Sequence, residues 1–516
     1  PRFFGVQRLV VSAQAEVRST WRIRFSGTGP LLAAGWGPLI AVLLAGLTVG
    51  FFAWFGVLVP LHNAAYSQAG LPLCVVLGAA LILWAWVAYA RYFAGRTGIK
   101  LDRSMQYDAL TWVPFLLLWF SFVLPLTVTR GSELAVICAA LFVLGKVLIA
   151  ARFNETVRDV LIDFAVSRFA IIVIAELAAA TIGQRAGTHV EESRSLLLNV
   201  WSRWDAVHYL AIAHNGYHGT DMAFFPLYPY LIRLLGNPVG NYLIAGLIIS
   251  TTAFFFGLLF LYKLVEHEFD RTVARRAIFY VSIFPTAVFF SAVYTEALFF
   301  MLTVASFYYM REHKWFLAGL IGLFAAMTRV EGVLLVVPYA IEWFTANRSD
   351  LLGGLRRAWP VLLIPLGLAL YMGYLWILNG DPLTFSHVQS HWDRHLAAPW
   401  TSVITTFHKL SHATNALTVA QQLLELFFTA VMIGVLLGGW RQVKASYVAY
   451  MALSILVPMS TSSLMSMPRF ALVLFPMFVI FALWGKRAPV NNALVAFSLP
   501  LLGLFTVLFA DWYWVA

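Results

Sequence analysis

Long apolar stretches are the feature of this 516-residue sequence that most restricts its fold. About 20 apolar residues in a helix cross a bilayer, because a helix satisfies its own backbone hydrogen bonds. The apolar stretches lie near residues 36–60, 71–93, 110–128, 133–151, 165–182, 242–264, 277–293, 296–310, 315–328, 330–344, 358–378, 417–438, 445–460, 470–484 and 489–510. Some of them are too short to cross a bilayer alone. The sequence therefore predicts an all-α polytopic membrane protein.

Composition agrees with that class, since 61% of the residues are hydrophobic and 11% are charged, against roughly 25% charged in a soluble domain. The net charge of +11 does not indicate nucleic acid, because Lys and Arg usually mark cytoplasmic loops in membrane proteins. Cys74 and Cys138 fall within apolar stretches, so no disulfide framework is indicated. Residues 1–30 are rich in arginine without a cleavage pattern, which predicts a cytoplasmic arm with a surface helix.

The distribution of basic residues predicts the topology. A cytoplasmic N-terminus with alternating spans places most of the 35 Lys and Arg residues on the cytoplasmic side. Residues 315–344 form either one long tilted helix or a hairpin that turns at 328–332. The hairpin fits better, because a single helix moves the later basic loops outside. The polar loops 183–241, 379–416 and 460–469 then share the outer side.

The polar stretch between Trp201 and Pro229 is the first candidate site. If residues 200–213 are helical, five of them share one face: Trp201, Trp204, Asp205, His208 and Ile212. Two indoles suit a helix in the membrane interface, whereas a carboxylate does not. Asp205 is therefore either an active carboxylate or the N-cap of a helix that begins at Ala206.

Other ionisable residues stand in or beside apolar stretches, where they are costly and become functional candidates. Glu296 either binds substrate or favours the start of a helix. Arg329 and Glu331 either act directly or pair within the bundle. Arg469 either binds a phosphate through its forked guanidinium or contacts lipid headgroups.

Three histidines are spaced four residues apart in the second outer loop, at positions 387, 391 and 395. An interfacial helix explains them better than a metal site, because no nearby carboxylate completes a ligand set. We therefore expect no metal and no other cofactor.

Several motifs occur in one order along the chain. They are Trp204-Asp205-Ala206, His208, Gly216-Tyr217, Ala223-Phe-Phe-Pro226 with Pro229, Phe284-Pro285, Ser291-Ala292, Tyr294-Thr-Glu296-Ala-Leu-Phe299, Thr328-Arg329 with Gly332, Gly380-Asp-Pro382, Trp392 with Arg394, and Pro468-Arg469 with Phe475-Pro476. Together they resemble the GPI mannosyltransferase 2 (PIG-V) family with its bacterial relatives. Glu331 departs from the eukaryotic pattern, which has Asn there.

The resemblance implies a GT-C fold, a multispanning helical bundle with interfacial helices in large outer loops. It implies transfer of mannose from a polyprenyl phosphate carrier, such as dolichol phosphate mannose, to a hydroxyl of a glycan or glycolipid. Asp205 and His208 are then the catalytic residues. A second group of residues binds the donor phosphate, and Arg469 is the leading candidate among them. That group is Arg469, Arg329 and Arg394, and the residues expected to contact substrate are Trp204, Tyr217, Phe225, Glu296, Glu331, Gln389 and Trp392.

The resemblance covers residues 155–516 and leaves 1–154 as an arm with about four additional spans of unknown function. We expect a monomer among membrane lipids, in a bacterial plasma membrane or the endoplasmic reticulum, with its site on the outer or lumenal side. The alternatives are another GT-C transferase, such as a lipid-linked glycan ligase or protein O-mannosyltransferase, and a lipid or sugar transporter. A transporter fits less well, because transporters tend to show inverted repeats and helices broken near the midplane.

Overall fold

The computed structural model describes residues 147–148, 151–152, 154–182, 196–349 and 358–515. The chain divides into two compact units, Pro1–Ile149 and Ala150–Ala516, and only the second is described in any detail. The predicted arm, the first three predicted spans, almost all of the fourth, and both cysteines lie outside the described residues.

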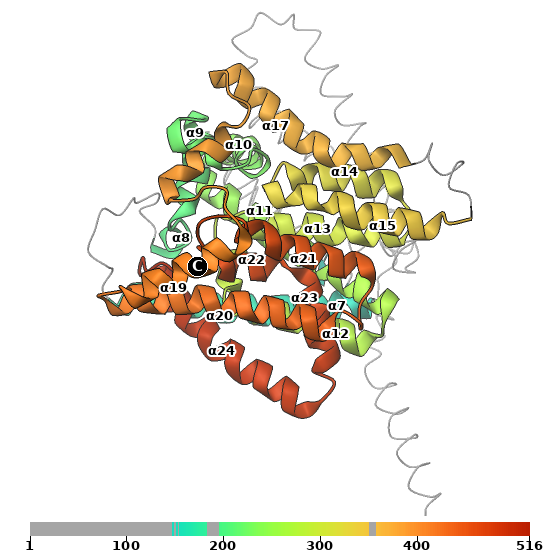
Figure 1. The fold of residues 1–516 in the computed structure, drawn as a ribbon. Helices are drawn as coiled ribbons and strands as arrows, with labels where there is room; N and C mark the ends of the chain where they lie inside the picture. The colour runs from blue at the N-terminus through green and yellow to red at the C-terminus, as the bar shows by residue number, and fades with distance from the viewer. Residues whose placement is uncertain (1–146, 149–150, 153, 183–195, 350–357, 516) are drawn as a thin grey trace, which may run out of the picture. The chain divides into compact units, whose positions relative to one another are not determined.

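The described part of the second unit is helical, and its one strand-like pairing is an isolated bridge between Leu396 and Thr461. Figure 1 shows the arrangement. The elements are α7 (Glu155–Thr181), α8 (Leu196–Asn199), α9 (Asp205–Asn215), η3 (Gly219–Ala223), α10 (Leu227–Val239), α11 (Tyr242–Glu268), α12 (Arg271–Ser282), η4 (Ala287–Phe290), α13 (Glu296–Arg311), α14 (Trp315–Ala326), η5 (Val330–Leu335), α15 (Val336–Ala346), η6 (Trp359–Leu362), α17 (Leu363–Asn379), α18 (Thr384–His387), η7 (Val388–Trp392), α19 (Pro399–Ser411), α20 (Ala416–Gly439), α21 (Ala445–Met459), α22 (Met467–Val473), α23 (Phe475–Trp484) and α24 (Ala488–Ala510). The prediction of an all-α protein is confirmed.

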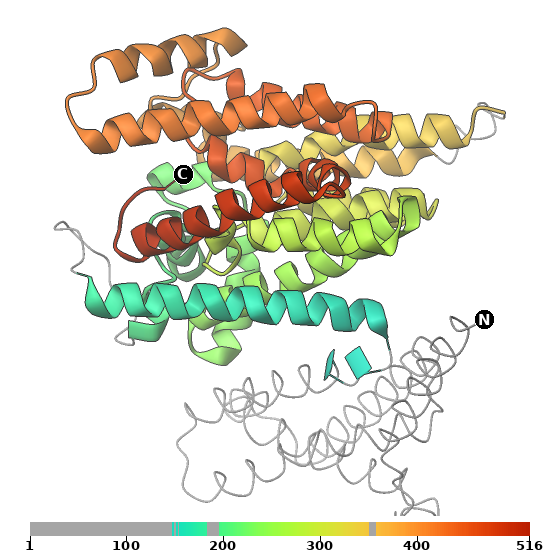
Figure 2. The same ribbon diagram turned by 90° about the horizontal axis from the view of Figure 1, so that it is seen from below.

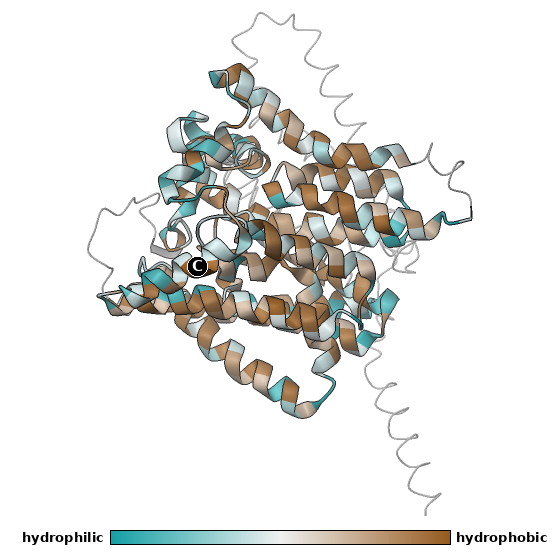
Figure 3. Cartoon of the chain, viewed as in Figure 1, coloured by the Kyte–Doolittle hydropathy of each residue, from teal (hydrophilic) through white to brown (hydrophobic). Residues whose placement is uncertain are grey.

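Four of the described helical segments are long and apolar enough to cross a membrane: Tyr242–Glu268, Trp359–Asn379, Ala416–Gly439 and Ala488–Ala510. α22 and α23 make a fifth if they are one span bent by 73°. Large apolar side chains are exposed along several of these helices. In Figure 3 the ribbons of these helices are largely brown, the colour of hydrophobic residues. A water-soluble protein avoids apolar exposure on that scale. The chain is therefore an integral membrane protein.

Side-chain caps explain where several long helices begin. Asn154, Asn241, Asp270 and Asn415 precede α7, α11, α12 and α20, and each side chain accepts a hydrogen bond from a backbone N–H of the first turn. Such a cap satisfies one of the N–H groups that the start of a helix leaves without a partner. In Figure 2 α7, in teal, runs along one edge of the unit, where it packs against α11, α12 and α24.

The span predicted at 277–293 is wrong. α12 ends at Ser282, and the chain continues through irregular backbone and the short 3₁₀ turn η4 before α13 begins at Glu296. Pro285 follows the end of α12, and a proline lacks the N–H that a continuing helix needs. The interruption matters for function because it brings Tyr294 and Glu296 to the centre of the unit, where both side chains are buried.

Residues 315–344 break as the hairpin predicts. α14 ends at Ala326, and the 3₁₀ turn η5 follows and packs against it. Gly332 makes this turn possible. A Cβ at position 332 would lie 2.3 Å from the carbonyl carbon of Ala325 and 2.4 Å from the nitrogen of Ala326. The backbone thus approaches α14 more closely than any other residue type allows.

We expect Gly332→Ala to destabilise the protein by about 1–3 kcal/mol, the usual cost of forcing an extra group into a packed interior. The measurement is the unfolding midpoint of the detergent-solubilised protein. Gly434→Ala is the matched control, because a Cβ there meets nothing within 4 Å and Ala favours helix more than Gly. Equal midpoints for the two variants would contradict the close approach at Gly332.

Candidate active site

A cavity of about 1160 Å³ opens where the start of α9, the turn before η5, the loop 385–396, α20, and the segment from Thr461 to Phe470 come together. A typical small-molecule pocket has roughly 300–1,000 Å³. The space therefore exceeds what one small ligand needs and allows two substrates to meet.

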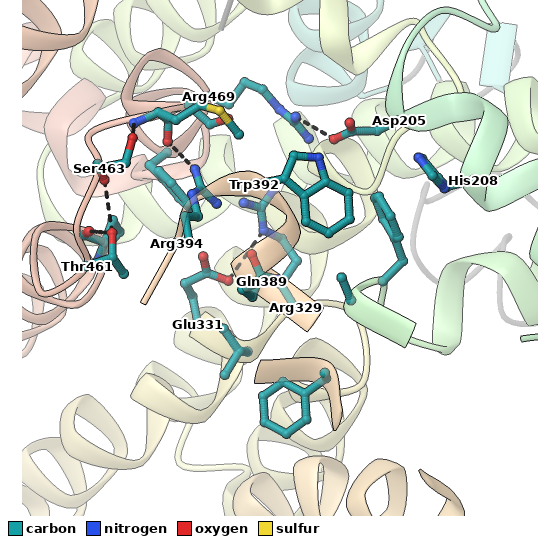
Figure 4. A pocket seen from close by; sticks show the side chains of 18 of the residues that line it. Asp205, His208, Arg329, Glu331, Gln389, Trp392, Arg394, Thr461, Ser463 and Arg469 are labelled. Atoms are coloured by element: carbon teal, nitrogen blue, oxygen red, sulfur yellow. Dashed lines mark hydrogen bonds and ion pairs between the residues drawn. The ribbon is translucent and has the colours of Figure 1, made fainter. Parts of the chain in front are cut away.

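One row of alternating charges lies at a wall of this cavity, and Figure 4 shows the four members that line it, Asp205, Arg469, Arg329 and Glu331. A guanidinium nitrogen of Arg469 lies 2.6 Å from Oδ2 of Asp205, and another lies 2.7 Å from Oε1 of Glu296. Arg329 lies 2.9 Å from that same Glu296 oxygen and 3.5 Å from Oε2 of Glu331. We call Asp205, Arg469, Glu296, Arg329 and Glu331 the charge row. It contains three carboxylates and two guanidinium groups.

Asp205 is the first residue of α9, so the helix predicted from residue 200 begins five residues later. The residue before it, Trp204, has φ 56°, a left-handed conformation that is unusual for a bulky residue and is often found at functional sites. Tyr294 fixes the turn, because its hydroxyl donates to the carbonyl of Arg203 at 3.0 Å and accepts from the N–H of Asp205 at 3.2 Å. Asp205 is not the N-cap, and its carboxylate is turned to Arg469.

Arg469 is enclosed in the protein. Its side chain is 6% exposed, and its guanidinium lies over the rings of Phe289 and Tyr294, 5.2 and 4.9 Å from their centroids. The alternative that it contacts lipid headgroups is therefore wrong. Because Asp205 and Glu296 both pair with it, its charge is already compensated.

Glu296 begins α13, and its side chain is completely buried, with 0% exposure. It is absent from the cavity lining, and one of its oxygens receives hydrogen bonds from both Arg469 and Arg329. The structure thus places Glu296 behind the two arginines, where it orients them without reaching the cavity. Burial lowers the pKa of Arg329, but Glu331 and Glu296 outweigh it and hold that pKa above its ordinary value.

Arg394 differs from the other two arginines. It lines the cavity and donates to the carbonyl of Met465, and among the described residues no carboxylate lies within ion-pairing distance of it. Its buried Nε has no hydrogen-bond partner. Burial, together with the positive charge of Arg469, lowers its pKa. A site with an uncompensated guanidinium is suited to bind an anion.

His208 lies one turn after Asp205 and faces the cavity mouth. Its Nδ1 lies 2.7 Å from Oδ1 of Asp221, and its ring stacks on Phe224 with 4.6 Å between centroids. Asp221, on η3, orients the imidazole. Sequence reasoning missed this partner, although an acidic residue between two motifs of the same polar loop is a usable signal.

The remaining predicted residues divide into two groups. Those that line the cavity are Trp204, Phe225, Glu331, Gln389 and Trp392. Tyr217 does not line it: the ring packs in a buried cluster with Phe225 and Tyr371, and the hydroxyl donates to the carbonyl of Phe224 at 2.9 Å. Tyr217 therefore shapes the loop and does not reach the cavity.

The histidines at 387, 391 and 395 do not share one helix face. α18 gives way to the 3₁₀ turn η7, and Asp393 follows with φ 53°. His387 pairs with Asp381 at 2.7 Å instead. No group of three or more His, Cys, Asp or Glu side chains in the described part of the chain is placed to hold a metal ion.

Two parts of the lining were missed from the sequence. Trp512 and Trp514 pack edge-on against Trp204, with centroids 5.8 and 5.3 Å away, and nothing in the sequence marks them. α20 contributes Gln421, Gln422 and Glu425. For Glu425 a signal existed, because an ionisable residue inside an apolar span is a functional candidate.

Comparisons with known proteins agree with the predicted resemblance. Residues 172–352 match the family model described as mannosyltransferase (PIG-V). GPI mannosyltransferase 2 from two strains of Cryptococcus neoformans var. neoformans serotype D is 33% identical over 144 residues, which are 25% of this chain and 34% of the relative. The chain therefore spans about a third of the length of the curated relatives that it matches.

Among solved structures, the crystal structure of the Archaeoglobus fulgidus oligosaccharyltransferase, tethered with an acceptor peptide, is similar at a TM-score of 0.33 and 13% identity. The similarity covers 67% of this chain and 55% of that one. The resemblance predicted from the motifs is thus confirmed: residues 172–352 are similar to the PIG-V mannosyltransferase family, and 144 residues of the chain are similar to GPI mannosyltransferase 2.

Proposed function

We propose that this protein is a membrane mannosyltransferase of the GT-C type, which moves mannose from a polyprenyl phosphate carrier to a hydroxyl of a glycan or glycolipid. The observation that carries the proposal is one cavity holding both an oriented carboxylate, Asp205, and an uncompensated guanidinium, Arg394. The PIG-V match supports mannose as the sugar. The position of the cavity in a membrane-spanning unit supports a donor carried by a lipid.

The reaction needs a proton acceptor, and Asp205 has that role. The acceptor oxygen forms a bond to C1 of the mannose, the bond from C1 to the phosphate oxygen breaks, and its electron pair leaves with the phosphate. The proton of the attacking hydroxyl passes to Asp205, a form of general-base catalysis worth about 10²–10⁴ in rate. An alcohol is much less acidic than a carboxylic acid, so the proton moves late, as the new bond forms. Arg469 keeps the carboxylate in place.

The departing phosphate needs a positive charge. Arg469 was the first candidate by sequence, but its two carboxylate partners already neutralise it. Arg329 is held by Glu296 and Glu331. We therefore assign the principal phosphate contact to Arg394, with Arg329 beside it in the lining. Guanidinium groups supply the charge in this proposal, without a metal.

We also propose that the cavity lies on the outer or lumenal side of a bacterial plasma membrane or of the endoplasmic reticulum. Basic residues stand in the first turns of α12 and in the connections after α20 and α23, and none of these lines the cavity: Arg271, Arg275, Arg441, Lys444, Lys486 and Arg487. Basic connections are typically cytoplasmic. The cavity then opens at the opposite face.

The test is a transfer assay with the purified full chain in lipid vesicles. Radiolabelled mannose is supplied either on polyprenyl phosphate or as GDP-mannose, with octyl α-D-mannoside as a model acceptor. We expect labelled product only from the lipid donor. Product from GDP-mannose alone would overturn the proposed donor, and movement of the lipid donor across the bilayer without transfer would favour a transporter.

We expect Arg394→Gln to raise the KM for the lipid donor about tenfold or more, because it removes a charge-assisted contact worth about 1.5–3 kcal/mol. The donor KM is measured at a fixed acceptor concentration. Arg441→Gln is the control, since Arg441 is exposed, lies over Trp440 and is absent from the cavity lining. An unchanged donor KM in the Arg394 variant would move the phosphate site elsewhere.

A further inference from the structure

α20 places a polar strip inside a candidate membrane span. Gln421, Gln422 and Glu425 all face the cavity, although Gln422 and Glu425 are only 9% and 8% exposed. Glu425 is the tenth residue of α20, which at 1.5 Å per residue is about 14 Å along the helix. Burying a carboxylate and two amides at that depth is costly unless they find partners.

The described part of the chain provides no direct partners for these side chains. In the described residues, none of the three accepts or donates a side-chain hydrogen bond, and Glu425 has no cation within ion-pairing distance. Lys409, on α19, lines the same part of the cavity and makes no ion pair, and its charge and that of Arg394 act on Glu425 from a greater distance. The strip is therefore left open to a ligand.

The chemistry of the strip indicates the ligand class. A carboxylate accepts hydrogen bonds, an amide both donates and accepts, and an ammonium group donates. Thr461 and Ser463 also line the cavity: the Thr461 hydroxyl donates to the carbonyls of Pro458 and Ser463 and can still accept, and the Ser463 hydroxyl accepts from the N–H of Met465 and can still donate. Neighbouring sugar hydroxyls offer both donors and acceptors, so they match this set. A phosphate would be repelled by Glu425, and a hydrocarbon chain would leave the side chains of Gln421, Gln422 and Glu425 without a partner.

We propose that the α20 strip, formed by Gln421, Gln422 and Glu425 with Lys409, is the acceptor subsite and binds the hydroxyls of a glycan headgroup. This inference rests on the proposed mannose transfer and assigns a binding place to its second substrate. The donor phosphate lies at Arg394, and the acceptor glycan is held by α20. The reacting hydroxyl of the acceptor then points to Asp205 in the same cavity.

The experiment measures the acceptor and the donor separately. With octyl α-D-mannoside as acceptor and polyprenyl phosphate mannose as donor, we expect Glu425→Gln to raise the acceptor KM about tenfold, and the donor KM to stay within about twofold. Gln422→Leu is the second variant, in case the first folds poorly. Glu312→Gln is the matched control, because Glu312 is exposed and pairs only with exposed Lys314.

A binding measurement without donor tells the two proposals apart. Octyl α-D-mannoside is expected to raise the unfolding midpoints of the wild-type protein and of the Glu312→Gln variant. It is expected to raise the midpoint of the Glu425→Gln variant much less. Stabilisation with no transfer by the wild type would overturn the mannosyltransferase proposal and leave the glycan subsite standing. An equal rise in all three proteins, or an effect of Glu425→Gln on the donor KM alone, would overturn the acceptor subsite.

Discussion

Asp205→Asn is expected to lower mannose transfer by about 10²–10⁴-fold, the usual contribution of a general base. Asn keeps the size of the side chain but cannot take the proton of the attacking hydroxyl. The backbone at this position is fixed independently of the carboxylate, because the Tyr294 hydroxyl holds both the Arg203 carbonyl and the Asp205 N–H. Arg469 also keeps its pairing with Glu296 in the variant. The loss should therefore appear in kcat, with little change in the donor KM.

The matched control for this variant is Asp393→Asn. Asp393 is exposed and does not line the cavity, although its neighbours in the sequence do. Its backbone has the left-handed conformation that Asn accepts well. Initial rates and unfolding midpoints are measured for both variants. If Asp205→Asn transfers mannose at the wild-type rate while folded, Asp205 is not the base. A collapse of both midpoints would show instead that the loss comes from unfolding.

Glu296→Gln is expected to reduce stability more than any other single change in the site. Removing one partner of a buried ion pair costs about 3–5 kcal/mol, because it leaves a buried charge without compensation. Here a fully buried carboxylate serves two arginines at once, Arg469 at 2.7 Å and Arg329 at 2.9 Å. After the change, Arg469 keeps only Asp205, and Arg329 keeps only the more distant Glu331.

Chemical unfolding of the detergent-solubilised protein measures this loss. The comparison is Glu312→Gln, an exposed Glu→Gln change whose ion pair is worth little. A midpoint for Glu296→Gln as high as that of the control would show that the two arginines find other partners. In that case the charge row would owe its geometry to surrounding packing, and Glu296 would lose its assigned role.

The sequence was sufficient to identify most members of the charge row. Glu296, Arg329 and Arg469 stand out because ionisable residues are rare beside apolar stretches. Their pairing was not accessible, since Asp205 and Arg469 are 264 positions apart and meet only through the fold. Tyr217 was predicted to contact substrate because it belongs to a motif, but its ring packs in a buried cluster behind the cavity wall. The motif alone did not reveal this packing.

The helices were predicted correctly where an apolar stretch is uninterrupted. The prediction failed where the local backbone conformation determines where a helix begins or ends. The stretch at 242–264 became α11 almost unchanged. The stretch at 277–293 contains Pro285 and is divided between the end of α12 and a buried, mostly irregular segment, so it does not form one continuous helix. The start of α9 moved to Asp205 because Trp204 has a positive φ, which periodicity does not reveal.

The shared oxygen of Glu296 has a consequence for kinetics. Arg469 and Arg329 both pair with this one atom, so a change at either arginine alters the field at the other and, through Arg469, at the proton acceptor. Substitutions within such a network are generally non-additive, often by about 0.5–3 kcal/mol. Rate losses from single variants along the row therefore should not sum, and only double-variant cycles will separate leaving-group stabilisation from base activation.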